Sequence, residues 1–509
     1  MANTDLAAAR RYHERTKHSF QSVRASRHFL DWDIMPRPFK VYPDLEPIPL
    51  PRDFTSSTRP ALAAIAAIAN PGAATGTGPQ LDRTALARLF YFSAGVLRRT
   101  TYPGGEMFYR AAACTGALYH IDLYLVCGSL PDLDPGVYHF GPHDFALRRL
   151  RAGDHRETVI RATGREPAAT AAPALVLFTS TFWRNSWKYQ ARAYRHCFWD
   201  SGTILANLLG LAAAVDLPAR VVLGFVDDEL NRLLDLDTAR EVTLGVVALG
   251  RGAPPAPPAP AAAPLGLATL PLSAREVDYP AIREAHEASC LMTTEEAAAW
   301  HGTTPRPAPS PVEAPVSLAS VDADAVPEPI ETVIRRRGSM RDFSPEPLRF
   351  DQLSAIMRTI TRGVPGDFTA PGAALTDPYL IVNAAEGLPS GTYVFDRERD
   401  ALVALRAGTS RREAGFLDLG QSLGAEAALD LYWLADLDRA LDRFGNRGYR
   451  AAQLEAAIEG GKAYLAAYAL RLGATGLTFF DDDVTAFFSP HAAAKSVMFL
   501  TALGPGRRR

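Results

Sequence analysis

The chain has little cysteine and no long apolar run, and these shortages exclude several classes of protein. Its 509 residues include four cysteines, none in a Cys-x-x-Cys pair, which argues against a disulfide framework and a structural zinc site. No stretch reaches the roughly 20 uninterrupted apolar residues that span a bilayer, and the amino-terminal stretch lacks the apolar core of a signal peptide. We therefore expect a cytoplasmic protein with no metal site and no membrane contact.

The chain also lacks an excess of charge of either sign. Its formal net charge is -2 at pH 7 and its pI is about 6.6, so no overall basic field exists to bind nucleic acid. With 47% hydrophobic and 22% charged residues, it has the composition of an ordinary globular protein that can bury more than one core. We expect two domains and no nucleic-acid partner.

Two distant stretches of the sequence repeat each other. Residues 136–153 read GVYHFGPHDFALRRLRAG, and residues 391–408, which lie 255 positions further on, read GTYVFDRERDALVALRAG. Chance similarity would not keep one register over a long span, so we infer a tandem duplication. The same offset pairs Asp122 with Asp377, Arg192 with Arg447, Tyr194 with Tyr449, and Arg195 with Arg450.

Each copy is predicted to hold the same order of helices and strands. In the first copy we expect a helix at 83–96, a strand at 123–127, a hairpin, a long helix at 201–215, a β-rich run at 220–225 and a last strand at 242–249. The second copy matches these with 350–361, 379–382, 455–472, 476–480 and 496–503. This order predicts an α+β fold.

The repeat divides the chain into four parts. These are an amino-terminal extension at 1–75, a first domain at 76–252, a linker at 253–326 and a second domain at 327–509. Pro/Ala-rich tracts at 254–264 and 305–315 cannot pack a core, and a short helical insertion at 282–301 separates them. Two equal copies predict an intramolecular pseudo-dimer, because surfaces that pair identical subunits can pair within one chain. Two independent domains on a string are the alternative.

A basic segment at the start of the second copy is a candidate phosphate site. In IRRRGSMRDF, Arg337, Ser339 and Arg341 alternate just before a helix, so that two guanidinium groups and a hydroxyl can face one side. The chain ends GPGRRR, which places Arg507 and Arg509 in a second basic cluster. A solvated basic run is the alternative interpretation.

These features resemble the nitroreductase-like flavoproteins, which grip the phosphate of FMN with an Arg-x-Ser-x-Arg segment and a basic tail. The resemblance implies that both domains have a nitroreductase-like fold and that the five residues just named bind the FMN phosphate. Backbone N–H groups near Gly476 and Leu477, in LGATGLTFF, are candidates for hydrogen bonds to the flavin. A plain buried strand is the alternative there.

The first copy has a loop that resembles the flavin-facing loop Arg-x-x-Pro-Ser-x-Gly-Ala-Leu of this family. Here the sequence is RAAACTGAL, with Ala113 and Cys114 at the Pro-Ser positions. His120, just after the loop, is a candidate substrate contact. The residues that the resemblance places against FMN are Arg110, Cys114, Thr115, Gly116 and Leu118.

More closely, the whole chain resembles the SagB-type, or thiazoline-oxidase-type (SagB/ThcOx), branch of the family, including its segments YHERTKHS and RPFKVYPDLEPIPLP. Members of that branch are FMN-dependent dehydrogenases that oxidise azoline rings in ribosomal peptides to azoles, and a Lys-Tyr pair is implicated in the oxidation. Lys188 and Tyr189, in WKYQARAYR, match that pair and are candidate catalytic bases. A surface lysine beside a core tyrosine is the alternative.

The two copies keep different parts of such a site. The offset of 255 carries Lys188 and Tyr189 to Arg443 and Phe444, and the flavin-facing loop is shorter in the second copy. The first copy has ANPGAATGTGP where the second has its Arg-x-Ser-x-Arg segment. We therefore predict one complete FMN site between the halves and a decayed second site.

The expected function is FMN-dependent dehydrogenation of a ring or Cα–N bond in a peptide or amino-acid-derived natural product, with other biosynthetic enzymes as partners. Two alternatives stay open: an NAD(P)H-dependent nitro or quinone reductase, and a non-catalytic scaffold in a peptide-modifying complex. The aspartate runs that begin at Asp227 and Asp481 stand at predicted helix starts, where we expect them to cap helices rather than bind metal.

Overall fold

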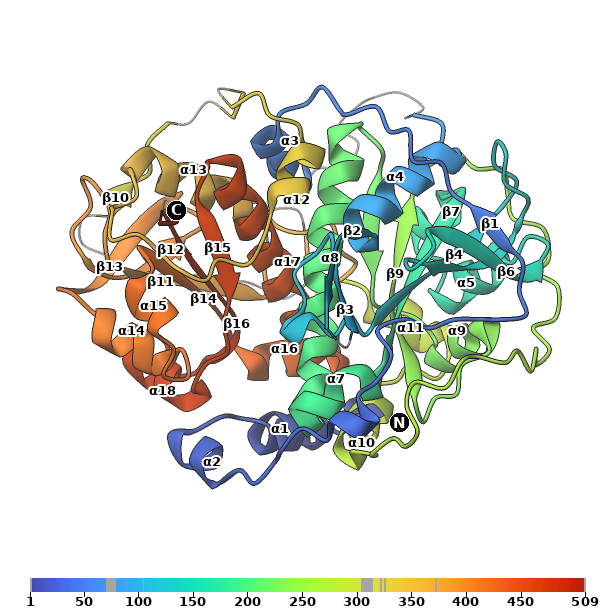
Figure 1. Cartoon of the computed structure of the whole chain (residues 1–509), viewed down its shortest axis with the longest axis horizontal. Coiled ribbons are helices and arrows are strands. Elements are labelled where there is room, and N and C mark those ends of the chain that lie inside the picture. The colour runs from blue at the N-terminus through green and yellow to red at the C-terminus, as the bar shows by residue number, and fades with distance from the viewer. Residues whose placement is uncertain are drawn as a thin grey trace.

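Two α+β halves of the same topology lie side by side in the computed structural model (Figure 1). It describes residues 2–69, 79–103, 105–303, 315–320, 323–324, 326–370 and 373–507. The sheet of the first half has the order β1-β6-β5-β4-β7-β9-β8, and that of the second has the equivalent order β10-β13-β12-β11-β14-β16-β15. This confirms the predicted α+β fold of two tandem domains. Nearly all of the 305–315 tract and of ANPGAATGTGP lies outside the described residues.

The strands of each sheet pair in antiparallel fashion. A separate hairpin is formed by β2 (Val96–Tyr102) and β3 (Gly105–Arg110). The first sheet holds β1 (Pro47–Pro49), β4 (Ile121–Cys127), β5 (Gly136–Gly141), β6 (Ala146–Ala152), β7 (Ala174–Thr181), β8 (Ala219–Val222) and β9 (Glu241–Leu249). The second holds β10 (Val316–Ser317), β11 (Thr376–Val382), β12 (Gly391–Asp396), β13 (Ala401–Ala407), β14 (Leu429–Ala435), β15 (Gly473–Gly476) and β16 (Ser496–Gly504).

Helices cover the sheets and fill the space between the halves (Figure 1). Those before and within the first half are α1 (Leu6–Arg15), α2 (Phe20–Ala25), α3 (Ala61–Ala67), α4 (Arg83–Ala94), α5 (Arg156–Ala162), α6 (Pro167–Ala171), α7 (Phe182–Tyr189), α8 (Ala193–Ala214) and α9 (Asp227–Leu234). Those that follow are α10 (Pro280–Glu287), α11 (Thr294–Trp300), α12 (Ile330–Arg336), α13 (Phe350–Ile360), α14 (Arg411–Leu417), α15 (Ser422–Glu426), α16 (Leu437–Phe444), α17 (Arg447–Ala469) and α18 (Asp481–Phe488).

The long helices α8 and α17 form the centre of the interface between the halves (Figure 1). Glycines allow their close approach: a Cβ on Gly202 would lie 2.4 Å from the Cβ of Ala457, and one on Gly461 would lie 2.6 Å from that of Ala206. The stretch 182–214 is long and apolar enough to cross a membrane by composition, but its apolar window is fully buried inside the protein. This stretch is therefore buried as a core helix. The packing of α8 against α17 joins the two halves into the predicted intramolecular pseudo-dimer.

The structural repeat begins earlier than the sequence division placed it. The sequence His-Glu-x-Thr spans the end of helix α1, and His-Glu-x-Ser spans the end of helix α10. Arg195 donates to the carbonyl of His13 (2.7 Å) and to the hydroxyl of Thr16 (3.0 Å). Arg450 makes the same two bonds to the equivalent residues of α10, at 2.8 Å each. The "extension" and the "linker helix" are therefore equivalent parts of the two repeats.

The first aspartates of α9 and α18 are ion-pair partners rather than helix caps, which corrects the expectation from sequence. Asp227 and Asp481 are the first residues of their helices, and the residue before each holds the N-cap position. Both carboxylates are buried and face arginines of the opposite half. Asp481 accepts from Arg195 (2.6 Å) and Arg192 (3.0 Å), and Asp227 accepts from Arg447 (2.7 Å) and Arg450 (2.9 Å).

Candidate functional site

A cavity of about 900 Å³ between the halves brings together predicted site residues from both copies. Its volume is typical of sites for small molecules and cofactors. Residues 15–28, around α2, form part of its wall. The first half contributes Ala113, Cys114, Thr115, Gly116, Lys188, Tyr189, His196, Trp199 and Asp200, and the second half contributes Ser339, Arg341, Tyr464, Thr475, Gly476, Leu477 and Thr478.

Lys188 and Tyr189 lie at the end of α7, where both side chains reach the cavity. The Nζ atom of Lys188 is 5.4 Å from the centre of the Tyr189 ring, and that ring meets His196 edge-on at 4.7 Å. Burial, together with Asp200 and Cys114, raises the pKa of Tyr189 well above its ordinary value. Tyr189 is therefore protonated at neutral pH and suits a hydrogen-bond donor, so the structure does not favour it as the base.

The loop at 113–117 is held against the cavity by Asp200. The carboxylate of Asp200 accepts from the Thr115 N–H (2.9 Å), the Thr115 hydroxyl (2.8 Å) and the Cys114 thiol (3.0 Å). Gly116 has a positive φ of 65°, and a Cβ there would lie 2.7 Å from the Tyr189 hydroxyl oxygen. Glycine is favoured at this position both by its backbone conformation and by the closeness of Tyr189.

His120 does not reach the cavity, so the predicted substrate contact is corrected. Its imidazole is fully buried, with Nε2 2.9 Å from the Asp200 carboxylate and Nδ1 2.8 Å from the Ser180 hydroxyl. His120 directly precedes the central strand β4, and its side chain lies between Asp200 and Ser180. It is placed to hold Asp200 rather than a substrate.

Arg110 and Leu118 also lie away from the cavity. The guanidinium of Arg110 donates to the carbonyls of Pro38 (2.8 Å) and Ile121 (3.3 Å). Leu118 packs in a small separate cluster with Trp183 and Trp187. Both residues therefore support the loop from behind, and neither is placed to contact a flavin as predicted.

The candidate phosphate residues divide into two groups. Ser339 and Arg341 line the cavity as expected. Arg337 instead donates to the carbonyl of Ala111 in the opposite half (3.1 Å) and lies 5.8 Å from the centre of the Tyr464 ring. It fixes the position of the loop across the interface, and it does not line the cavity.

The carboxyl-terminal arginines contribute less than the sequence indicated. Arg507 forms an ion pair with Asp342 (3.0 Å) and donates to the carbonyl of Phe343 (3.1 Å), and it does not line the cavity. Arg509 lies outside the described residues. Of the five predicted phosphate ligands, Ser339 and Arg341 are the two that this structure places at the cavity.

The end of β15 forms one wall of the cavity. The Gly476 N–H donates to the hydroxyl of Tyr464, and the Leu477 N–H donates to a carbonyl of β16 (3.4 Å), so both predicted flavin donors have partners within the protein. By contrast, the hydroxyl oxygens of Thr475 and Thr478 are buried without a partner among the described residues. Because buried polar atoms are normally hydrogen-bonded, these hydroxyls fit a ligand with a polar edge.

Sequence reasoning missed Asp200, although the repeat held a signal for it. The offset of 255 pairs Asp200 with Glu455, so both halves carry an acid at this position. Glu455 accepts from the N–H groups of Leu375 (2.7 Å) and Thr376 (2.9 Å), at the start of β11. Both acids therefore bind the chain that leads into this strand, which indicates a positioning role for Asp200, because an acid is kept in the half without the Lys-Tyr pair.

The equivalent strand edge in the other half is covered by protein. The carboxylate of Asp367 accepts from the N–H groups of Leu223 (2.9 Å) and Gly224 (2.8 Å), just beyond β8. Strand register makes Leu223 the counterpart of Thr478. The shortened loop of the second copy thus occupies the space at the end of β8. This space is the counterpart of the cavity and is the second position of the pseudo-dimer.

The linker also fills this second position. The indole of Trp300 lies 4.9 Å from the ring of Phe444, the counterpart of Tyr189, and donates to the Phe444 carbonyl (2.8 Å). Arg443, the counterpart of Lys188, donates to the carbonyl of His301 (2.7 Å). These contacts show that protein occupies the second position. That the cavity is the one complete FMN site stays a prediction.

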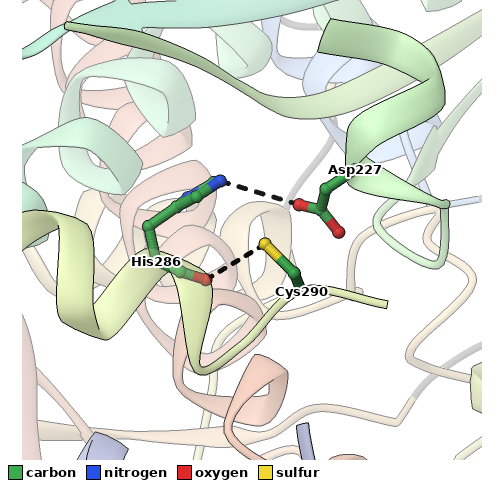
Figure 2. Close-up of side chains that lie close together, drawn as sticks. All are labelled: Asp227, His286 and Cys290. Atoms are coloured by element: carbon green, nitrogen blue, oxygen red, sulfur yellow. Dashed lines mark hydrogen bonds and ion pairs between the residues drawn. The ribbon is translucent and has the colours of Figure 1, made fainter. Parts of the chain in front are cut away.

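A group of possible metal ligands occurs at the interface. Figure 2 shows Asp227, His286 and Cys290 converging, with ligand atoms within 4.8 Å of one another. However, the Asp227 carboxylate already pairs with Arg447 and Arg450, and a divalent ion would have to displace these two cations. The group is better explained as part of the ion-pair network between the halves.

Comparison with known proteins shows the family. The sequence model of the Nitroreductase family matches residues 137–251 and 334–503, which is more than half of the chain. The chain therefore belongs to the Nitroreductase family, and it is an oxidoreductase of a family that typically uses flavin cofactors.

Individual relatives agree with this assignment. A protein of Anabaena variabilis described as a nitroreductase aligns at 26% identity over 98% of this chain and 99% of its own, with a TM-score of 0.77. A protein of Methanocaldococcus jannaschii named as a nitroreductase is 29% identical over 162 residues, which cover 30% of this chain and 81% of that protein. A chain of the E. coli microcin synthetase McbBCD complex aligns at 19% identity over 49% of this chain and 93% of its own. Its TM-score of 0.31 is too low to bear on function.

Proposed function

We propose that this protein is an FMN-dependent, SagB-type dehydrogenase that oxidises a ring or Cα–N bond, such as an azoline, in a peptide or amino-acid-derived natural product. One observation carries the proposal. Lys188 and Tyr189 of the first half line the same cavity as Ser339 and Arg341 of the second half. This shared lining supports a composite site to which one half contributes a candidate Lys-Tyr pair and the other half candidate phosphate ligands.

The residues of the cavity fit FMN. The Ser339 hydroxyl and the Arg341 guanidinium suit a phosphate. The unpartnered hydroxyls of Thr475 and Thr478 suit the polar edge of a flavin ring. The counterpart strand end in the first half supports this fit, because the N–H groups of Leu223 and Gly224 beyond β8 donate to the carboxylate of Asp367 from the second half.

Oxidation of an azoline to an azole removes two electrons and two protons from the ring. FMN, when bound, would supply the acceptor for a hydride. Lys188 is the candidate to take the proton from carbon, because its amine lies at the cavity wall beside Tyr189. Tyr189, which is protonated, would donate a hydrogen bond that orients the ring or an adjacent carbonyl.

A second candidate is an NAD(P)H-dependent reductase of nitro compounds or quinones. The family assignment and the names of the relatives favour it. In that reaction Lys188 would attract the anionic dinucleotide, and no base would be needed.

An anaerobic flavin-reduction assay separates the candidates. We expect a synthetic peptide with one thiazoline ring to bleach the oxidised flavin of the FMN-loaded protein. Lys188→Gln should slow that bleaching by about 10²-fold or more, the usual contribution of an acid–base group. Tyr189→Phe should slow it less, because the Tyr189 hydroxyl only orients the ring. Rapid bleaching by NADPH, with no reaction of the peptide, would support the reductase instead. A protein that binds no FMN would support a scaffold.

A further inference from the structure

Helices α2 and α11 are equivalent elements of the two repeats. Each follows a chain segment that is anchored to the buried aspartate of the interface. The N–H of His18 donates to Asp481 (2.8 Å), and the N–H of Leu291 donates to Asp227 (3.0 Å). The two segments therefore leave the interface from equivalent points. The first leads to α2 at the cavity, and the other leads to α11 at the second position.

The caps of these helices align them residue by residue. Ser19 caps α2 by accepting from the N–H of the third helical residue (3.1 Å), and Thr293 caps α11 in the same way (3.2 Å). Counted from these caps, Ser26, the C-cap residue that follows the six residues of α2, stands at the number of Trp300, the last residue of α11. The residue that fills the second position with an indole thus has a small polar counterpart beside the cavity.

The two helices differ in how closely they pack. Helix α11 buries Ala297 (0% exposed) and Trp300 (4% exposed), and the Trp300 indole packs on Phe444 of the second half. Helix α2, which is described in full, buries none of its six residues, and its apolar Phe20 and Val23 are 49% and 38% exposed. The two equivalent helices therefore differ in burial: α11 is partly buried in the protein, and α2 is exposed along its whole length.

The cavity occupies the gap beneath α2. Ser22, Val23 and Ser26 line it, and so do Leu419 and Gln421 of the second half. In the other repeat the corresponding gap is closed: a Cβ on Gly164, the repeat equivalent of Leu419, would lie 2.9 Å from the Cβ of Ala298 in α11. The open volume is thus the space that α11 fills on its own side.

We infer that α2 is a substrate-binding element that closes on a flat, apolar group of the substrate, as α11 closes on the second position. This inference rests on the proposed function, since a ring in a peptide would be that group. Val23 would contact the ring or its apolar neighbour, and the absence of a large side chain at Ser26 leaves room for it. In the second repeat, the Trp300 indole occupies the equivalent room permanently.

Replacing Ser26 by tryptophan should give α2 the packing of α11. The variant Ser26→Trp supplies the missing indole, and Gln21→Trp is the control, because Gln21 lies on the same helix, is exposed and does not line the cavity. Trypsin cleavage after the exposed residues Arg24 and Arg27 reports closure without any need for flavin or turnover. We expect cleavage at these two bonds to slow at least tenfold in Ser26→Trp and to stay at the wild-type rate in Gln21→Trp.

Cleavage of Ser26→Trp at the wild-type rate would overturn the proposed closure of α2. Ser26→Phe serves the same test if the tryptophan variant does not accumulate.

The thiazoline peptide tests the contact between Val23 and the substrate. Where the wild type oxidises it, Val23→Ser should raise KM several-fold and leave kcat nearly unchanged, and an unchanged KM would contradict the contact. If the wild type does not oxidise the peptide, the azoline proposal fails, while the cleavage rates still decide whether α2 closes.

Discussion

Arg195 and Asp481 are in contact across the centre of the molecule, with Nη1 2.6 Å from Oδ1, although 286 positions separate them in the chain. The counterpart pair, Arg450 and Asp227, has its atoms 2.9 Å apart. A contact made twice, each time from one half to the other, is typical of an isologous interface between identical subunits. The duplication has therefore kept a dimer contact within one chain.

Removing the charge of Asp481 should destabilise the protein strongly. Asp481→Asn leaves Arg192 and Arg195 buried without their counter-charge, and the loss of one partner of a buried pair costs about 3–5 kcal/mol. Urea unfolding measures the change. Asp482→Asn is the matched control, because its side chain is 77% exposed and such pairs contribute about 1 kcal/mol or less. Equal losses in the two variants would contradict a central role for the buried pair.

The same carboxylates should make stability fall in acid. Burial raises the pKa of Asp227, but Arg447 and Arg450 outweigh it and lower the pKa to about 2, and the pKa of Asp481 is likewise lowered by its two arginines. Since an unfolded aspartate titrates near about 3.9, this stabilisation is complete above that pH and is lost as the pH falls toward 2. We expect the free energy of unfolding of the wild type to drop over this range. A smaller drop in Asp481→Asn would identify the group, and an equal drop would exclude it.

A side chain at Gly116 should destabilise the protein while Tyr189 is present. Gly116→Ala adds a Cβ at a positive φ and 2.7 Å from the Tyr189 hydroxyl oxygen, so we expect the free energy of unfolding to fall by about 1–3 kcal/mol. Tyr189→Phe in the same background removes the closest atom and should recover part of the loss. The coupling follows from a double-mutant cycle. Strictly additive effects would show that the two groups do not touch.

The sequence predicted the pseudo-dimer well because the duplication preserved one offset across the buried core. It did not show that α1 and α10 are equivalent, because His13 and His286 are 273 positions apart and so fall outside the register of 255. Nor could it show that Trp300 fills the second position, since a linker helix has no fixed place until the halves are packed together.

The candidate site was predicted less completely than the fold. The residue types that contact the cavity were recognised, but the direction of a side chain depends on tertiary packing. Arg110 and His120 stand beside the loop in sequence, yet the former binds carbonyls behind it and the latter binds Asp200. Arg337 was expected at a phosphate, and it bridges to the opposite half instead.

Arg341 should distinguish FMN from riboflavin. If its guanidinium binds the phosphate, Arg341→Gln removes a charge-assisted hydrogen bond worth about 1.5–3 kcal/mol and should raise the Kd of FMN roughly tenfold or more. The Kd of riboflavin, which lacks the phosphate, should not change. Titration of flavin fluorescence measures both constants.

Arg335→Gln is the control for this experiment. Arg335 belongs to the same basic segment, but it lies over the rings of Tyr91 and Phe92 (5.6 and 4.8 Å) and does not line the cavity. An equal loss for both flavins, or an equal effect of Arg335→Gln, would show that Arg341 does not hold the phosphate.

The flavin content per chain tests the composite site most directly. The purified protein is saturated with FMN and freed of excess, and the flavin released on denaturation is identified and quantified against protein concentration. We predict one FMN per chain in the wild type, and also in Trp300→Ala, because the second position lacks the Lys-Tyr pair and its loop is bound to β8. Two FMN per chain in the wild type would contradict a single site between the halves.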